Sequence, residues 1–139
     1  DERVGDAIRE SVREHYRKAI NKERACCHGG DEVSQVRAAK ERMLEKAGYS
    51  RDQIEAFPED MLEEFMGSGN PTALAQIEPG QTVLDVGSGA GLDCLVAAMK
   101  TGPQGKVIGL DMTAEMIGRA RLNADRMGLK NIEFRQILL

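Results

Sequence analysis

The residues of this chain with the clearest chemical potential are two aspartates that belong to apolar, strand-like runs. Asp85 lies within Thr82–Val86, directly before the turn Gly87–Gly91, and Asp111 ends the next apolar run. Glycines let a backbone turn approach a ligand closely, and a carboxylate at the end of the second strand accepts hydrogen bonds from ribose hydroxyls. The order of strand, glycine turn, helix, strand and acid therefore predicts a site for an adenosine group.

The spacing of the glycines separates the classes of adenosine cofactor. A dinucleotide fingerprint needs glycine or alanine where this chain has Leu92, and the chain contains no G-x-x-x-x-G-K-[ST] phosphate loop. The pattern G-x-G-x-G, preceded by Asp85, resembles motif I of the class I S-adenosylmethionine-dependent methyltransferases. An oxidoreductase that binds NADH is the rival interpretation.

This resemblance implies S-adenosylmethionine as the cofactor, with its amino acid end at the turn and its ribose at Asp111. The cofactor-binding residues expected from it are Asp85, Gly87, Ser88, Gly89, Gly91, Asp111, Met112 and Asn70. Some of them also have a purely structural interpretation. Asp85 can cap the turn, Asp111 can cap the following helix, and Met112 can pack in the core instead of against adenine.

Three cysteines are the other candidates for chemistry. Cys26 and Cys27 lie beside His28, where a glycine pair interrupts the helical pattern. They are either soft ligands for a thiophilic element or ordinary loop cysteines. Cys94 follows the glycine turn, and we expect it to be buried as a small hydrophobic residue. Because there is no second paired cluster, the sequence predicts no closed metal site.

Hydrophobic periodicity predicts the elements that position these groups. Helices are expected over 1–25, 31–47, 50–57, 58–66, 71–77, 91–101 and 114–127, and strands over 82–86, 106–110 and 132–136. Gly48 is expected to end the second helix, and Ser50 with Gln53 to form a capping box. The apolar face expected for the second helix comprises Val33, Val36, Met43, Leu44 and Ala47.

The pattern changes near Pro79 from consecutive helices to alternating strands and helices. It predicts an α/β fold, in which an N-terminal helical cap over 1–77 precedes a partial Rossmann-like half domain over 78–139. That half domain is a βαβαβ unit with a parallel sheet in strand order 3-2-1. Such methyltransferases carry a larger sheet, so the C-terminal half is expected to be absent from this chain.

A longer series of motifs narrows the resemblance. Its parts are Gly48-Tyr49-Ser50, Pro58, Gly67-Ser68-Gly69-Asn70-Pro71, and the segments 83–94 and 107–113. The series resembles the arsenite S-adenosylmethionine methyltransferases, which methylate trivalent arsenic held by cysteine thiolates. The resemblance makes Cys26 and Cys27 candidate substrate thiols.

One departure from this family bears on the substrate. Ser68 stands where the family usually has cysteine, and no cysteine follows Cys94. The acceptor therefore stays open between trivalent arsenic and an ordinary small molecule with a carbon, nitrogen or oxygen nucleophile. A non-catalytic fragment that binds S-adenosylmethionine is a further alternative.

Composition argues against several other classes of protein. The chain is 41% hydrophobic and 30% charged, as expected for a globular protein. A formal net charge of −4 argues against a nucleic-acid partner. No apolar run approaches the roughly 18 residues of a membrane span. With no signal-like start and no even set of cysteines, a cytoplasmic location is expected. Nothing in the sequence indicates an oligomeric state.

Overall fold

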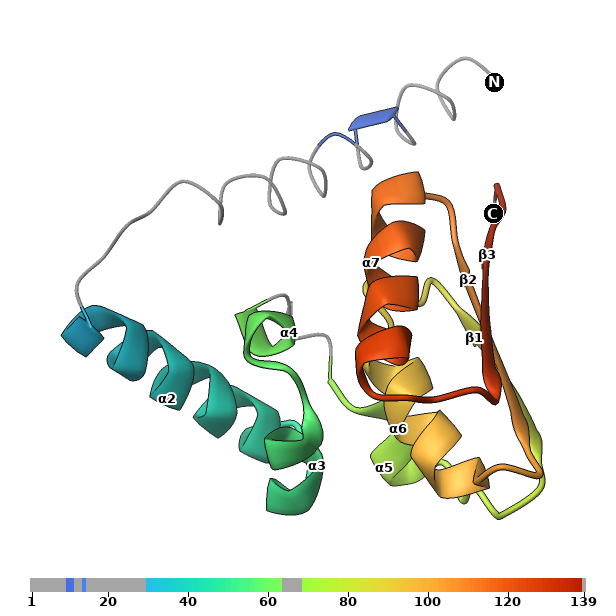
Figure 1. Cartoon of the computed structure of the whole chain (residues 1–139), viewed down its shortest axis with the longest axis horizontal. Helices are drawn as coiled ribbons and strands as arrows, with labels where there is room; N and C mark the ends of the chain where they lie inside the picture. The colour runs from blue at the N-terminus through green and yellow to red at the C-terminus, as the bar shows by residue number, and fades with distance from the viewer. Residues whose placement is uncertain (1–9, 12–13, 15–29, 64–68, 139) are drawn as a thin grey trace.

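A computed structural model describes residues 10–11, 14, 30–63 and 69–138 of the chain (Figure 1). In chain order its elements are α2 (Gly30–Lys46), α3 (Arg51–Ala56), α4 (Glu59–Glu63), α5 (Pro71–Leu74), β1 (Thr82–Val86), α6 (Leu92–Thr101), β2 (Lys106–Asp111), α7 (Ala114–Arg126) and β3 (Ile132–Gln136). Nearly all of the helix expected over 1–25 lies outside the described residues. Cys26, Cys27 and Ser68 also lie outside them.

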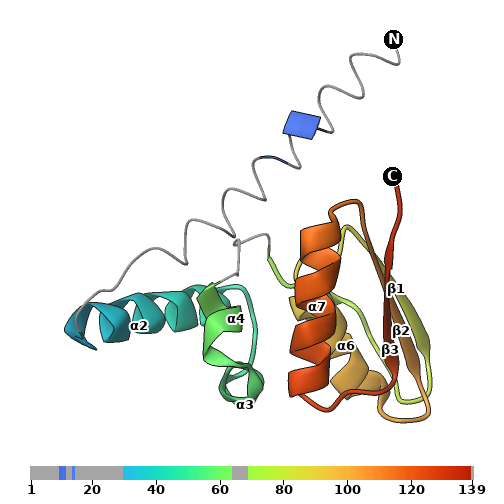
Figure 2. The same cartoon turned by 45° about the horizontal axis from the view of Figure 1, so that its top comes forward.

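The three strands form one parallel sheet in which β2 lies between β1 and β3. Val86 pairs with Leu110, and Asp111 pairs with Gln136. Helices α6 and α7 each connect two successive strands and cover the same face of the sheet (Figures 1 and 2). Right-handed crossovers that advance in one direction place successive helices in this way. The predicted α/β fold and its strand order are confirmed.

One hydrophobic core joins the helical segment to the α/β unit. It gathers Leu44, Tyr49, Ile54, Phe57, Met61 and Leu62 from the helices before β1, and Cys94–Ala98, Val107, Ile117, Ala120, Ala124 and Phe134 from the α/β unit. The face of the sheet that α6 and α7 do not cover is open to solvent, since Leu84 and Val86 are each 58% exposed. No helix within the described ranges has the length and apolarity that a membrane span requires.

Local signals set the ends of α2 and α3 as predicted. Gly48 has a φ of +93°, and its N–H donates to the Glu45 carbonyl oxygen at the end of α2. Glycine adopts this left-handed conformation without the strain that a Cβ would add. The side chains of Ser50 and Gln53 each accept a backbone N–H of the other residue, which completes the capping box.

Two expectations about the helical segment were wrong. Val36 and Met43 are 52% and 46% exposed. The buried face of α2 is therefore narrower than the apolar face predicted from its sequence, and it centres on Leu44. The helix that begins at Pro71 ends at Leu74 rather than at Ile77, because Ala75 already has an extended backbone. A helix of one turn is stabilised by few hydrogen bonds, so α5 ends after one turn and the chain continues toward β1.

Candidate functional site

The carboxyl edge of the sheet brings the predicted site residues together. The turn after β1 is fastened to the end of β2, because the N–H groups of Gly87 and Ser88 both donate to the Leu110 carbonyl oxygen at 2.7 and 2.9 Å. Asp111 is the last residue of β2 and therefore lies at the same edge. Ligands of open parallel sheets bind outside the carboxyl ends of the strands, which is where this cluster is placed.

The glycines of this turn serve two different purposes. A Cβ on Gly91, where φ is +90°, would lie 2.8 Å from the Phe134 ring and 3.1 Å from Ala120, so this glycine permits close packing between α6, α7 and β3. At Gly87 and Gly89 nothing lies within 4 Å of an added Cβ. The backbone at these two positions therefore borders open space that a ligand could occupy.

Ser88, between these two glycines, carries an unused polar group. Its side chain is buried, and its Oγ has no hydrogen-bond partner among the described residues. Leaving a buried hydroxyl without a partner costs about 1–3 kcal/mol. A polar ligand that reached this turn would supply the missing bond, so the observation fits the amino acid end of S-adenosylmethionine.

Asp111 connects the turn to the start of α7. Its Oδ2 accepts the Gly89 N–H at 2.9 Å, and its Oδ1 accepts the Thr113 N–H at 2.8 Å. Each carboxylate oxygen has a second lone pair, so both can still accept hydrogen bonds from ribose hydroxyls. The neighbouring Met112 is only partly buried and does not belong to the core cluster. Its place beside Asp111 suits contact with an adenine ring.

Asp85 lies on the helix-covered face of β1, below the turn. Its Oδ2 accepts a hydrogen bond from the Cys94 thiol, with a sulfur-to-oxygen distance of 3.2 Å. Cys94 is fully buried, as predicted. Burial and, secondarily, the charge of Asp85 raise the pKa of this thiol. Cys94 is therefore a neutral hydrogen-bond donor that orients the Asp85 carboxylate.

A second hydrogen bond to a carboxylate at this edge was not predicted from the sequence. The Tyr49 hydroxyl donates to Asp93 Oδ1 in the first turn of α6. Burial raises the pKa of Asp93, and the nearby charge of Asp85 adds to the effect while the Tyr49 hydrogen bond opposes it. Tyr49 and Asp93 both lie within the motif series, but they are 44 residues apart and only packing brings them together.

Asn70 has a structural role in the described chain. Its side-chain oxygen caps α5 by accepting the Ala73 N–H at 3.1 Å and the Thr72 hydroxyl at 2.6 Å. Lys100 of α6 donates to the Thr72 carbonyl oxygen at 2.6 Å, which holds this capped turn against the α/β unit. The predicted cofactor role of Asn70 stays a prediction.

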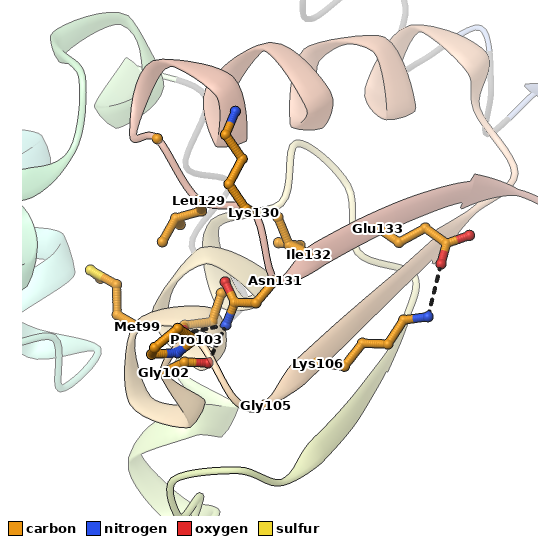
Figure 3. A pocket seen from close by; sticks show the side chains of 12 residues that line it. Met99, Gly102, Pro103, Gly105, Lys106, Leu129, Lys130, Asn131, Ile132 and Glu133 are labelled. Atoms are coloured by element: carbon orange, nitrogen blue, oxygen red, sulfur yellow. Dashed lines mark hydrogen bonds and ion pairs between the residues drawn. The ribbon is translucent and has the colours of Figure 1, made fainter.

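The amino ends of the strands form a different hollow. A cavity of about 740 Å³ is lined there by the α6–β2 and α7–β3 loops (Figure 3). Lys106 and Glu133 form an ion pair of 3.3 Å at its side, and the Asn131 amide donates to the Gly102 carbonyl oxygen at 2.8 Å. None of the predicted site residues lines it. The described residues also contain no cluster of three His, Cys, Asp or Glu side chains suited to a metal ion.

Comparison with known proteins finds similarity to methyltransferases. Residues 77–137 match a family model described as a methyltransferase domain. The arsenite methyltransferase of Halobacterium salinarum is 41% identical over 140 residues, which cover 96% of this chain and 36% of that protein. The arsenite methyltransferase of Aquipseudomonas alcaligenes is 47% identical over 60 residues, which cover 40% of this chain and 17% of that protein.

A solved structure of an S-adenosylmethionine-dependent methyltransferase from Aquifex aeolicus is 30% identical, with a TM-score of 0.44. The match covers 71% of this chain and 47% of that one. The chain thus spans only part of the length of the relatives it matches, 36% in the case of the Halobacterium protein. The resemblance expected from the motifs is confirmed: residues 77–137 match a methyltransferase domain, and the similarity to the Halobacterium arsenite methyltransferase extends over 96% of the chain.

Proposed function

We propose that this chain provides the cofactor-binding part of an arsenite methyltransferase. The observation that carries the proposal is the extent of the similarity. The methyltransferase-domain match covers only residues 77–137, whereas the match to the Halobacterium arsenite methyltransferase covers 96% of the chain and so includes the helical segment. We accordingly treat 1–77 as a helical cap and 78–139 as the cofactor-binding half domain.

The residues expected to hold S-adenosylmethionine fit that group. Asp85 would hold its positively charged amino end, the Gly87–Gly91 turn its methionine portion and Asp111 its ribose hydroxyls, and Met112 would contact the adenine. Three observations support this assignment: the unused Ser88 hydroxyl, the open space at Gly87 and Gly89, and the free lone pairs of Asp111. When bound, the cofactor supplies a methyl group on an electrophilic sulfonium.

The chain's own contribution is to position the reacting groups and to exclude water from them. A methyl transfer from a sulfonium needs alignment of the nucleophile more than acid–base chemistry. The carboxylates of Asp85 and Asp111 lie near the carboxyl edge of the sheet and favour binding of a cationic ligand there. No described residue needs to act as a nucleophile in this scheme.

Trivalent arsenic is the proposed acceptor, because it is thiophilic and the chain carries a cysteine pair before α2. Thiolate sulfur is a soft ligand, whereas a hydroxyl such as that of Ser68 binds arsenic less tightly. Cys26 and Cys27 are the candidate thiols in this chain. Their chemistry requires a reducing compartment, which is why we propose a cytoplasmic location and a small metalloid substrate.

A methyl-transfer assay on the intact protein with arsenite, glutathione and S-adenosylmethionine tests the proposal. Methylated arsenic is the expected product, and a protein with both Cys26→Ser and Cys27→Ser is expected to form it more slowly. Turnover of an ordinary small-molecule acceptor without any arsenic product would overturn the substrate assignment. Calorimetry with S-adenosylmethionine and with NADH tests the cofactor separately, since binding of NADH alone would favour an oxidoreductase.

A further inference from the structure

One hydroxyl group joins three segments of the chain beside the cofactor site. Tyr49 follows the glycine that ends α2, and its side chain is 3% exposed. Its ring packs edge-on against Phe57, with ring centroids 6.4 Å apart. Its hydroxyl donates to Asp93 in α6 and lies 3.4 Å from the Gly69 carbonyl oxygen, directly before α5. The helical segment, the start of α5 and the start of α6 therefore meet at this group.

The next residue of α6 makes the corresponding contact with the sheet. Cys94 donates to Asp85, while Asp93 accepts from Tyr49, so adjacent residues of one helical turn connect to β1 and to the helical segment. The charge of Asp85 contributes to the raised pKa of Asp93, because the two carboxylates repel each other. The Tyr49 hydrogen bond counters this repulsion and fixes the direction of the Asp93 side chain.

We propose that Tyr49 and Asp93 form a positioning pair that fixes the helical segment over 30–63 relative to the cofactor side of the site. This inference rests on the proposed function and concerns the alignment step of the same site. α2 begins at Gly30, at the end of this helix away from Tyr49. Tyr49 anchors the other end of α2 to the first turn of α6, directly after the Gly87–Gly91 turn.

Removal of the hydroxyl alone tests this role. In Tyr49→Phe the ring still packs on Phe57, but Asp93 loses its donor. We expect kcat for arsenite methylation to fall by about tenfold or more, since small misplacements of reacting groups have large effects on rate. The KM for S-adenosylmethionine should change by only about twofold, because its binding residues stay in place. An unchanged kcat in Tyr49→Phe would overturn the proposal.

Two variants of Asp93 separate the hydrogen bond from the charge. Asp93→Asn keeps the acceptor oxygen and is expected to retain nearly the full kcat, whereas Asp93→Leu should match Tyr49→Phe. The double variant Tyr49→Phe/Asp93→Leu should be no slower than either single variant, because both remove one interaction. Additive losses, or an Asp93→Asn variant as slow as Asp93→Leu, would overturn the positioning role.

A control and an independent readout complete the experiment. Ile54→Val shortens a buried side chain of α3 and keeps both partners of the pair, so it should lower the urea midpoint and leave kcat unchanged. Hydrogen exchange of the intact protein needs no arsenite activity: Tyr49→Phe should speed exchange across 30–63 but not in β1 or β2. If arsenite is not methylated but this exchange pattern appears, the proposed substrate fails while the anchoring role stands; unaltered exchange would overturn the anchoring role.

Discussion

The carboxylate of Asp111 accepts the backbone N–H of Gly89 at 2.9 Å, so the acid that ends β2 holds the glycine turn that follows β1. The same carboxylate accepts the Thr113 N–H at the start of α7. One side chain thereby fixes the shape of the turn and presents its remaining lone pairs at the edge of the sheet. This dual use ties the stability of the site to its capacity to bind a ribose.

Replacement of Asp111 should therefore weaken both properties. Asp111→Ala loses two hydrogen bonds to backbone amides, and we expect the affinity for S-adenosylmethionine to fall by about 1.5–3 kcal/mol, roughly ten- to a hundredfold. Calorimetry on the intact protein measures this change. Glu115→Ala, on the exposed first turn of α7, is the control and should leave the affinity unchanged. An Asp111→Ala protein with unaltered affinity would contradict the ribose assignment.

Ser88 is expected to show opposite effects on stability and binding. Because its buried hydroxyl lacks a partner among the described residues, Ser88→Ala should stabilise the ligand-free protein by up to about 1 kcal/mol. The same change should weaken S-adenosylmethionine binding by about 0.5–1.5 kcal/mol, since the ligand then has one hydrogen-bond partner fewer. Urea unfolding with and without cofactor measures both values. Lower stability without the ligand would show that the hydroxyl already has a role in the fold.

The packing at Gly91 predicts a strong position dependence for glycine substitutions. Gly91→Ala places a Cβ 2.8 Å from Phe134 in a left-handed backbone, so we expect a loss of about 1–3 kcal/mol in the free energy of unfolding. Gly118→Ala in α7 has open space around its new Cβ and should stabilise the helix by about 0.5–1 kcal/mol. Thermal unfolding of both proteins checks the contrast, and similar shifts in Tm would refute it.

Alkaline pH should destabilise the fold through Cys94. Burial raises the pKa of its thiol above the ordinary value of 9.0, so the unfolded chain releases this proton at a lower pH than the folded protein does. The contribution to stability is complete below about pH 9 and is lost as the pH rises further. Urea unfolding between pH 8 and pH 10.5 should show this decline, and Cys94→Ala should make it shallower. An identical pH profile in Cys94→Ala would contradict the assignment.

Local sequence patterns determined the framework of this protein. The bounds of β1 and β3, the start of β2, the glycine that ends α2 and the capping box at Ser50 are all encoded by neighbouring residues. Alternating and helical periodicities, together with caps and turns, act over a few residues, so they can be recognised in a single chain. The glycine turn and Asp111 were also predictable, because parallel neighbouring strands must end at the same edge.

Tertiary structure alone decided which side chains meet at that edge. The Tyr49–Asp93 hydrogen bond depends on how the helical segment packs against α6, and the Cys94–Asp85 hydrogen bond depends on how α6 packs on β1. No local pattern specifies such partners. The exposure of Val36 and Met43 has the same origin, since an apolar stripe predicts a buried face but not how much of it a neighbour covers. Periodicity fixes the direction of a side chain relative to its own element, whereas its contacts depend on the distance and angle between elements, which the packed core sets.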